Sequence, residues 1–304
     1  MARKMIDFSK LTSEELKEFR DRYDAFIFDM DGCLVHLEAG PIDGVKEALN
    51  EIAKHGISIH IMTDNCLSTL KDISTRVNRL FPAIKKENVM SCGHLAVKYL
   101  KEINFNKKIY VMGSESGVIV ELKDYGFDVI YDDEVSKITI PELRKVTFEK
   151  NVGAVLVAAD MNFTFLKLFK AANYLADPEV LLMQTHLPNI ASVDPVLPAV
   201  GAIAASVKAG SGRNDSIATG KGSEYCTKYL KSLGYPVERC LFIGDGVPND
   251  IHAGNLSGMD TMLTLTGVCT LKSVEIAKAK NKETFIPTYY INSVADLIKA
   301  FKIE

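Results

Sequence analysis

Short apolar runs alternate with longer amphipathic segments along most of this chain. Runs such as residues 25–30 (AFIFDM), 57–62 (ISIHIM) and 240–244 (CLFIG) suit strands that are covered on both faces. The segment 45–54 and others like it have the spacing of surface helices. Alternation of this kind is typical of βαβ units, and it predicts an α/β fold with a mainly parallel sheet.

The length of the chain favours two domains over one. Single hydrophobic cores stop growing at about 250 to 300 residues, and this chain has 304. Strand and helix patterns between residues 108 and 175 predict a second α/β unit. An irregular connection within 91–106 and the proline-rich stretch 185–201 bracket it and are candidate hinges.

Charge and cysteine usage exclude several classes of function. The net charge is −3, from 36 basic and 39 acidic residues without long blocks, so we expect no nucleic-acid partner. No apolar stretch reaches the roughly 20 residues of a membrane span, and no signal peptide opens the chain. Six scattered cysteines without a CxxC pair favour reduced thiols over a disulfide framework or a zinc site. These features predict a cytoplasmic protein.

Two acids follow the first strong strand, in the sequence Asp29-Met30-Asp31-Gly32. Residues two apart in a strand point to the same face, so both carboxylates can flank one reacting group or hold a cation. In open α/β sheets, ligands bind at this carboxyl end of the strands. Two solvated loop acids ahead of a turn glycine are an equally good interpretation of the tetrapeptide alone.

A second acidic pair, Asp245 and Asp250, follows the strand at 240–244 in the sequence GDGVPND. Mg²⁺ prefers hard oxygen ligands and retains several waters, so two carboxylates at strand ends plus a substrate phosphate would suit it. Taken alone, this stretch is more typical of a turn and a helix N-cap. Its recurrence at a second strand end favours a metal site.

Two further segments offer groups for an anion. Thr63, Asp64 and Asn65 follow the strand at 57–62, where a hydroxyl and backbone amides opening a helix can bind phosphate. Lys221 lies between two glycines after a short strand, which brings its ammonium close to the backbone. Helix capping and an exposed loop lysine are the simpler interpretations of these segments.

The four segments, in this order, resemble the four motifs of the haloacid dehalogenase superfamily. They match the DMDG motif at 29–32, a motif II threonine at Thr63, a motif III lysine at Lys221 and the acidic GD motif at 244–245. Within the superfamily the chain is similar to the para-nitrophenylphosphatase group, which includes phosphoglycolate and pyridoxal phosphatases. The similarity extends over nearly the whole length.

The resemblance implies a role for each acid. Asp29 would attack phosphorus to form an aspartyl phosphate, and Asp31 would protonate the leaving alcohol and later activate water. Asp29, the backbone carbonyl of Asp31, and Asp245 would hold Mg²⁺, with Asp250 supporting that shell. Asp31 also favours phosphatase chemistry, because superfamily members that dehalogenate lack this second aspartate.

The same resemblance places the phosphoryl oxygens on Thr63 and Lys221, with Asp64 and Asn65 beside them. Motif II usually reads TNNS in this group, whereas here it reads Thr63-Asp64-Asn65-Cys66. The additional carboxylate would repel an anionic substrate unless it points away. Cys33 and Cys66 lie next to the motifs, where redox regulation is an open alternative to inert, buried thiols.

The group carries a C2-type cap between motifs II and III. The implied domains are a core of residues 1–92 and 201–304 and an inserted α/β cap of residues 93–200. Relatives of this type commonly dimerise through the cap, so a homodimer is expected by analogy. The chain departs from the usual cap sequence at 158–165 and at His186, which is either a substrate contact or a partly solvated loop histidine.

These features predict a Mg²⁺-dependent phosphomonoesterase acting on a small metabolite that resembles phosphoglycolate, pyridoxal phosphate or an aryl phosphate. Two alternatives stay open. A catalytically silent protein could retain the phosphate pocket for binding or regulation, and a phosphoryl transferase or mutase could use the same core.

Overall fold

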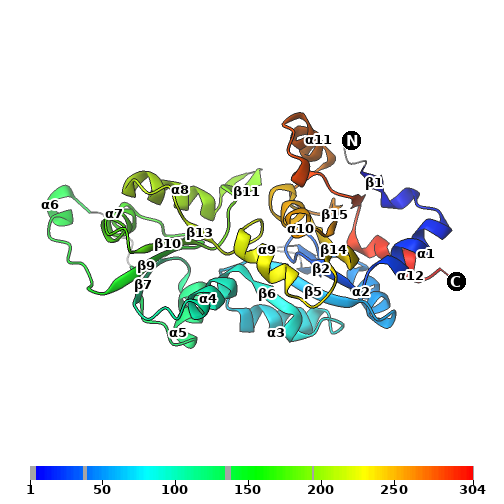
Figure 1. The fold of residues 1–304 in the computed structure, drawn as a ribbon, viewed down its shortest axis with the longest axis horizontal. Helices are drawn as coiled ribbons and strands as arrows, with labels where there is room; N and C mark the ends of the chain where they lie inside the picture. The colour runs from blue at the N-terminus through cyan, green and yellow to red at the C-terminus, as the bar shows by residue number, and fades with distance from the viewer. Residues whose placement is uncertain (1–4, 37–39, 134–137, 194, 304) are drawn as a thin grey trace. The chain divides into compact units, whose positions relative to one another are not determined.

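The computed structural model describes residues 5–36, 40–133, 138–193 and 195–303, and its chain divides into two compact units (Figure 1). The first unit combines Met1–Thr63, Lys71–Met90 and Lys221–Glu304, and the second combines Asp64–Leu70 and Ser91–Gly220. Each unit therefore contains segments that are distant in sequence. Each is described here by itself.

The first unit is built on a sheet in the order β1-β16-β15-β14-β2-β5-β6. Neighbouring strands in this order are parallel from β1 as far as β5. In chain order, its strands are β1 (Ile6–Asp7), β2 (Ala25–Phe28), β5 (Ser58–Thr63), β6 (Val89–Ser91), β14 (Cys240–Gly244), β15 (Asp260–Thr264) and β16 (Tyr289–Ile291). Strand β14 pairs directly with β2, with Ile243 opposite Phe28. Segments more than 200 residues apart thus meet at the centre of this sheet.

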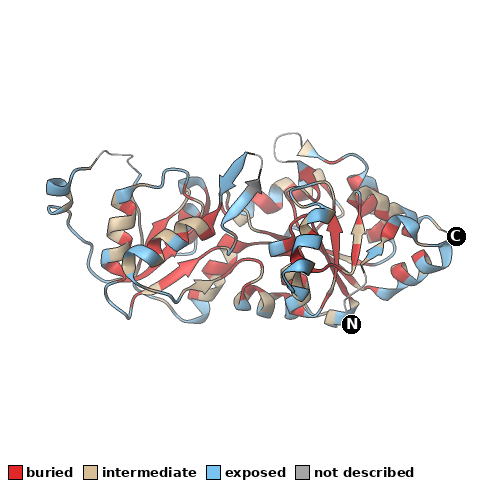
Figure 2. Ribbon diagram, turned by 90° about the horizontal axis from the view of Figure 1, so that it is seen from above, coloured by how far each residue is buried: buried red, intermediate tan, exposed pale blue. Residues whose placement is uncertain are grey.

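Helices of the first unit bury one face each, as their sequence spacing predicts. They are α1 (Ser13–Arg22), α2 (Val45–Lys54), α3 (Leu70–Leu80), α9 (Glu224–Lys231), α10 (His252–Ser257), α11 (Leu271–Ala279) and α12 (Ile298–Phe301). In α2 the buried residues are Val45, Ala48, Leu49 and Ile52, which share one stripe of the helix. Figure 2 shows the consequence: the strands are largely buried, and the helices expose only their outer faces. A short antiparallel pair, β3 (Val35–His36) and β4 (Gly40–Pro41), follows the first motif.

The second unit has its own parallel sheet in the order β13-β10-β9-β7-β8. Its strands are β7 (Lys108–Met112), β8 (Val129–Ile130), β9 (Val152–Val157), β10 (Leu181–Gln184) and β13 (Ile217–Ala218). Its helices are α4 (Cys92–Glu102), α5 (Val120–Asp124), α6 (Ile140–Leu143), α7 (Phe165–Tyr174) and α8 (Val200–Ser211). An antiparallel pair, β11 (Ile190–Val193) and β12 (Val196–Pro198), stands apart from this sheet.

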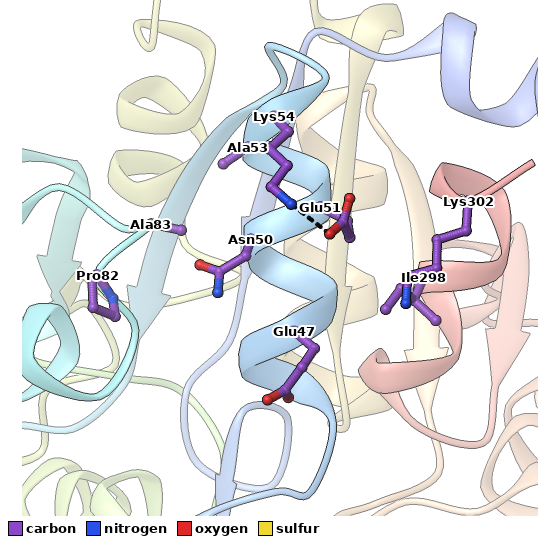
Figure 3. A pocket seen from close by; sticks show the side chains of 9 residues that line it. All are labelled: Glu47, Asn50, Glu51, Ala53, Lys54, Pro82, Ala83, Ile298 and Lys302. Carbon is purple, nitrogen blue, oxygen red and sulfur yellow. Dashed lines mark hydrogen bonds and ion pairs between the residues drawn. The ribbon is translucent and has the colours of Figure 1, made fainter.

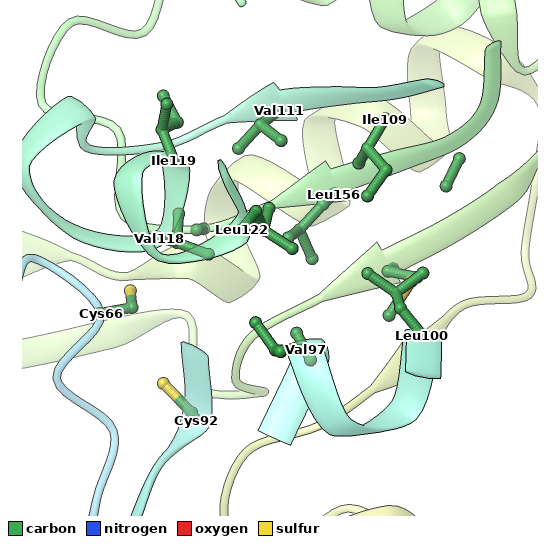
Figure 4. Close-up of a cluster of buried hydrophobic side chains, with 14 residues drawn as sticks. Cys66, Cys92, Val97, Leu100, Ile109, Val111, Val118, Ile119, Leu122 and Leu156 are labelled. Carbon is green, nitrogen blue, oxygen red and sulfur yellow. The ribbon is translucent and has the colours of Figure 1, made fainter. Parts of the chain in front are cut away.

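Alternation along β7 separates two cores in the second unit. Ile109 and Val111 face α4 and α5 in one hydrophobic cluster, which Figure 4 shows. Tyr110 and Met112 face α7 and α8 in another. Because successive side chains of a strand point to opposite faces, one apolar run fills both cores. Helices on both faces of the sheet therefore explain why β7 is apolar from Ile109 to Met112.

The predicted α/β fold with parallel sheets is confirmed, and some local expectations need correction. The stretch 91–106, expected to be an irregular connection, contains helix α4, which Ser91 caps by accepting the backbone N–H of His94. Apolar residues of α4 at helical spacing are the signal that was overlooked. Among the described residues, no helix is both long and apolar enough to cross a membrane.

The domain limits 1–92, 93–200 and 201–304 remain a prediction. The second compact unit extends beyond residue 200, to Gly220. It does so because α8 packs into the Tyr110 core and β13 pairs with β10. Residue 200 is the first residue of α8, so the predicted limit coincides with a helix start and not with the end of the unit.

Candidate active site

Strands β2 and β14 end side by side, and each is followed by one of the predicted acids. The backbone N–H of Asp29 donates to the carbonyl of Ile243 at 2.8 Å, which continues the β2–β14 ladder one residue beyond β2. Asp245 follows Gly244, the last residue of β14. Parallel pairing therefore brings the two carboxylates to the same edge of the sheet.

Lys221 lies among these acids and is almost fully buried, with 1% of its side chain exposed. Its ammonium donates to Asp250 at 2.6 Å and to Asp29. Carboxylate oxygens of Asp29, Asp245 and Asp250 all lie within 4.8 Å of one another. The structure thus brings together four of the predicted site residues, and the exposed loop lysine interpretation of Lys221 is wrong.

Asp245 is enclosed by backbone. One of its carboxylate oxygens accepts the N–H of Val268 at 2.7 Å, and a Cβ on Gly267 would lie only 1.9 Å from that oxygen. A Cβ on Gly32 would lie 2.5 Å from it, and Gly32 also has φ of +87°, a backbone conformation that favours glycine. Burial, together with the negative charge of Asp29, raises the pKa of Asp245 to about 7.

Asp250 lies in the π-helical turn Val247–Ile251 and supports the lysine. Its second carboxylate oxygen accepts the N–H of Gly246 at 2.8 Å. A Cβ on Gly244 would meet this carboxylate at 2.3 to 2.5 Å, so the strand must end in glycine here. Burial raises the pKa of Asp250, and the ammonium of Lys221 opposes that rise.

This donor set fits a hard divalent cation. Its members are carboxylate oxygens, which Mg²⁺ and Ca²⁺ prefer, and three carboxylates share one ammonium within the cluster. Buried carboxylates packed so closely repel one another, and burial together with the charge of Asp29 raises the pKa of Asp245. A bound divalent cation would restore the charge balance.

Asp31 and Thr63 lie at or just after the ends of two neighbouring strands, β2 and β5. Asp31 is half-buried in the turn that follows Asp29, where it forms a bridge with Val35. Thr63 is the last residue of β5, the strand next to β2, and it is 1% exposed. Both residues therefore lie at the sheet edge that carries Asp29.

The other predicted phosphate and substrate residues belong to the second unit. They are Asp64, Asn65 and His186. The side chain of Asn65 accepts the N–H of Leu67 at 3.0 Å, a local loop contact. The backbone carbonyl of Asp64 accepts a hydrogen bond from the Cys92 thiol at 3.1 Å. His186 has a ring nitrogen within 4.8 Å of the sulfurs of both Cys66 and Cys92.

The two cysteines near the motifs have opposite environments. Burial raises the pKa of the Cys33 thiol, and the nearby carboxylates raise it further. Hydrogen bonding from Cys92 lowers the pKa of Cys66, with a further contribution from His186, although Cys66 is buried. Cys92 was missed as a partner because it lies 26 positions further along the chain, without any motif to mark it.

A surface hollow of about 620 Å³ in the first unit lies elsewhere (Figure 3). Its walls come from α2, α12 and the loop at residues 82–83, and they contain the exposed ion pair of Lys54 with Glu51. None of the predicted site residues lines it. The buried acidic cluster is therefore the better candidate for chemistry.

Comparison with known proteins shows the family of this chain. Residues 26–128 match the haloacid dehalogenase-like hydrolases, and residues 218–297 match a second family described as HAD-hydrolase-like. The matched ranges include the four acids and Lys221.

Relatives that match over nearly their whole length include named phosphatases. The chain is 31% identical to phosphoglycolate phosphatase 2 of Arabidopsis thaliana over 298 residues, which covers 95% of this chain and 97% of the relative. It is 29% identical to chronophin of Homo sapiens, with 98% and 100% covered. The fold matches that of 4-nitrophenylphosphatase from Thermotoga maritima with a TM-score of 0.76 at 22% identity, covering 93% and 99%. The chain therefore belongs to the haloacid dehalogenase-like hydrolases, among relatives that are named as phosphatases.

Proposed function

We propose that this protein is a Mg²⁺-dependent phosphomonoesterase that hydrolyses a small phosphorylated metabolite through Asp29. The observation that carries the proposal is the buried ammonium of Lys221, which binds Asp29 and Asp250 beside Asp245. The names of two relatives, phosphoglycolate phosphatase 2 and 4-nitrophenylphosphatase, support a substrate that resembles phosphoglycolate or an aryl phosphate, and the resemblance to the para-nitrophenylphosphatase group adds pyridoxal phosphate.

In the first step a carboxylate oxygen of Asp29 attacks phosphorus. The new bond joins that oxygen to phosphorus, and the bond between phosphorus and the substrate oxygen breaks. Asp31 gives its proton to the departing oxygen, which leaves as an alcohol. An aspartyl phosphate on Asp29 and an ionised Asp31 result.

In the second step water cleaves the aspartyl phosphate. Asp31 takes a proton from the water while its oxygen attacks phosphorus, and the bond from phosphorus to Asp29 breaks. Inorganic phosphate leaves, and Asp29 and Asp31 return to their starting protonation states. Splitting the displacement in this way divides one difficult step into two easier ones.

Charge on the phosphoryl oxygens is neutralised by fixed groups. The ammonium of Lys221 and the hydroxyl of Thr63 hold two of these oxygens, with Asp64 and Asn65 next in the chain. Mg²⁺ held by Asp29, Asp245 and the backbone carbonyl of Asp31 would supply the remaining positive charge. Phosphoryl transfer depends mainly on such alignment and electrostatic stabilisation.

The test is hydrolysis of para-nitrophenyl phosphate with Mg²⁺ by the wild type and the Asp29→Asn variant. We expect activity to fall by at least about 1,000-fold, because the amide is a far weaker nucleophile than the carboxylate. Asp24→Asn is the matched control, since Asp24 lies just before the other end of β2 and pairs with Arg239 at 2.6 Å. It should retain wild-type turnover.

Unchanged hydrolysis in Asp29→Asn would overturn the proposed nucleophile. A wild type that binds phosphate and Mg²⁺ but hydrolyses no member of a broad panel of phosphorylated metabolites would instead favour the silent binding protein. Transfer of the phosphoryl group to sugar hydroxyls faster than to water would favour the transferase. The panel would also identify the substrate class.

By the family resemblance, the second unit would act as a cap that excludes water from the reacting centre and contacts the leaving group. A cytoplasmic location stays a prediction from the cysteine spacing.

A further inference from the structure

Two cysteines and a histidine meet in the second unit, apart from the acidic cluster. Cys66 comes from the loop 64–70, Cys92 is the first residue of α4, and His186 follows strand β10. Both sulfurs and a ring nitrogen of the histidine lie within 4.8 Å of one another. Cys66 and Cys92 are buried at one end of the cluster in Figure 4, and His186 is half-buried.

The sulfur of Cys66 is held in place by its surroundings. It accepts the N–H of Ala159 at 3.4 Å and the hydroxyl of Thr185 at 3.6 Å. A Cβ on Gly117 would lie 2.2 Å from the carbonyl oxygen of Cys66, so the loop can approach only because glycine is there. These contacts position the sulfur before any ligand binds.

The sulfur of Cys92 is fixed as firmly. Its thiol donates to the carbonyl of Asp64 at 3.1 Å, and its own carbonyl accepts the hydroxyl of Thr219 at 3.1 Å. It also stands at the start of an 11-residue helix, where aligned backbone N–H groups favour a thiolate. Separate elements thus hold both sulfurs at one place.

The spacing of these donors is close to that of a tetrahedral metal site. With Zn–S bonds of about 2.3 Å and Zn–N bonds of about 2.0 to 2.1 Å, donor atoms lie roughly 3.5 to 3.8 Å apart. Donors already within 4.8 Å would have to move closer together by about 1.3 Å at most. Two thiolates and an imidazole select zinc-like ions over Mg²⁺, which prefers oxygen.

We propose that Cys66, Cys92 and His186 bind one divalent ion of the zinc class at a site separate from the acidic cluster. The bound ion would tie the loop 64–70 to α4 and to the segment after β10. We therefore assign His186 to this site and not to the substrate.

The test uses the reduced, chelator-treated full-length protein with Co²⁺ as a spectroscopic probe. Thiolate ligation gives a sulfur-to-cobalt charge-transfer band that oxygen ligands do not produce. We expect this band at one equivalent of Co²⁺ and its disappearance when Zn²⁺ is added. Asp245→Asn should leave the band unchanged, which separates this site from the proposed Mg²⁺ site and from the proposed activity.

Variants assign the ligands. Cys66→Ser and Cys92→Ser should each abolish the band and weaken Zn²⁺ binding by at least about 100-fold, since even changes beyond the direct ligands cost 10- to 100-fold. His186→Asn should weaken Zn²⁺ binding by at least about tenfold. Cys240→Ser is the matched control, because this buried cysteine lies in the first unit and donates to Pro236, as serine can. It should bind as the wild type does.

Two outcomes would overturn the site. One is a reduced wild type without the charge-transfer band, and the other is a band that survives in both Cys66→Ser and Cys92→Ser. Circular dichroism checks the fold of each variant. If Cys92→Ser fails to fold, the wild-type band together with Cys66→Ser and His186→Asn still decides the question.

Discussion

At the scale of single residues, Asp245 is held by the close approach of two glycines. Gly32 and Gly267 leave no room for a Cβ beside its carboxylate, and the N–H of Val268 binds one oxygen at 2.7 Å. Backbone atoms therefore restrict the position of the Asp245 carboxylate. Rigid support of this kind is what a metal-binding carboxylate requires.

Replacing Gly267 with alanine should displace the Asp245 carboxylate. The new Cβ would lie 1.9 Å from the carboxylate oxygen, and its three nearest atoms all belong to the Asp245 side chain, so that side chain must move. We expect the Mg²⁺ concentration for half-maximal hydrolysis of para-nitrophenyl phosphate to rise by about 10- to 100-fold. A Mg²⁺ titration of the initial rate measures this.

Gly93→Ala is the control, because a Cβ there would make only ordinary contacts, at 3.6 Å and beyond. It should leave the Mg²⁺ requirement unchanged. An equal effect from both substitutions would mean that Asp245 does not depend on the Gly267 backbone.

The sequence could indicate which side chains gather in this cluster, but not the backbone that surrounds them. Asp29, Lys221 and Asp245 could be predicted because strand-end acids and a glycine-flanked lysine are unusual in buried positions. Gly267 could not, because a glycine 22 positions after Asp245 looks like any turn residue until the chain is folded.

At the scale of elements, a buried ion pair joins strand β9 to helix α7 in the second unit. Asp160 follows β9, and its carboxylate accepts from Lys167 of α7 at 2.7 and 3.0 Å. Only 2% of the acid side chain and 5% of the lysine side chain are exposed. Both charges are therefore removed from water and depend on each other.

Lys167→Met should destabilise the protein by about 3 to 5 kcal/mol, because it leaves the Asp160 carboxylate buried without its counter-charge. Adding Asp160→Asn should recover part of this loss. Urea unfolding monitored by circular dichroism measures the free energies of unfolding.

Lys278→Met is the matched control. Lys278 pairs with Glu275 at 2.9 Å in α11, but the side chains of Lys278 and Glu275 are 35% and 63% exposed. The control should cost no more than about 1 kcal/mol. Similar losses for the two substitutions would contradict the role of burial.

Elements with strong periodicity could be located from the sequence, and short ones could not. The segment predicted as a helix at 45–54 is α2 with the same bounds, and the strand predicted at 240–244 is β14. The last helical stretch of the chain begins instead as a 3-10 segment, Val294–Leu297, and continues as α12. Short helices lack the turns needed for a clear pattern, so packing decides their geometry.

At the scale of the whole molecule, the second unit exposes apolar residues on a hairpin outside its main sheet. Ile190, Val196 and Leu197 of β11 and β12 are 51%, 65% and 45% exposed. Exposed apolar side chains on a two-stranded sheet with open edges are typical of a contact surface. The family resemblance also favours a homodimer through this part of the chain.

A charged residue in the hairpin should therefore disrupt self-association. We expect the wild type to elute as a dimer in gel filtration and Val196→Asp to shift towards the monomer, because a buried charge in an interface is costly. Ile140→Asp is the control, since Ile140 is 70% exposed in α6 of the same unit. A monomeric wild type would rule out the dimer.

The sequence by itself determined the α/β class, because strand and helix periodicities are local properties of the chain. It also determined which acids end which strands. Only the tertiary structure decided that β14 lies beside β2, which unites Asp29, Asp245, Asp250 and Lys221. Strand order depends on long-range packing, which no local pattern encodes. For the same reason only the folded chain could bring Cys66, Cys92 and His186 together.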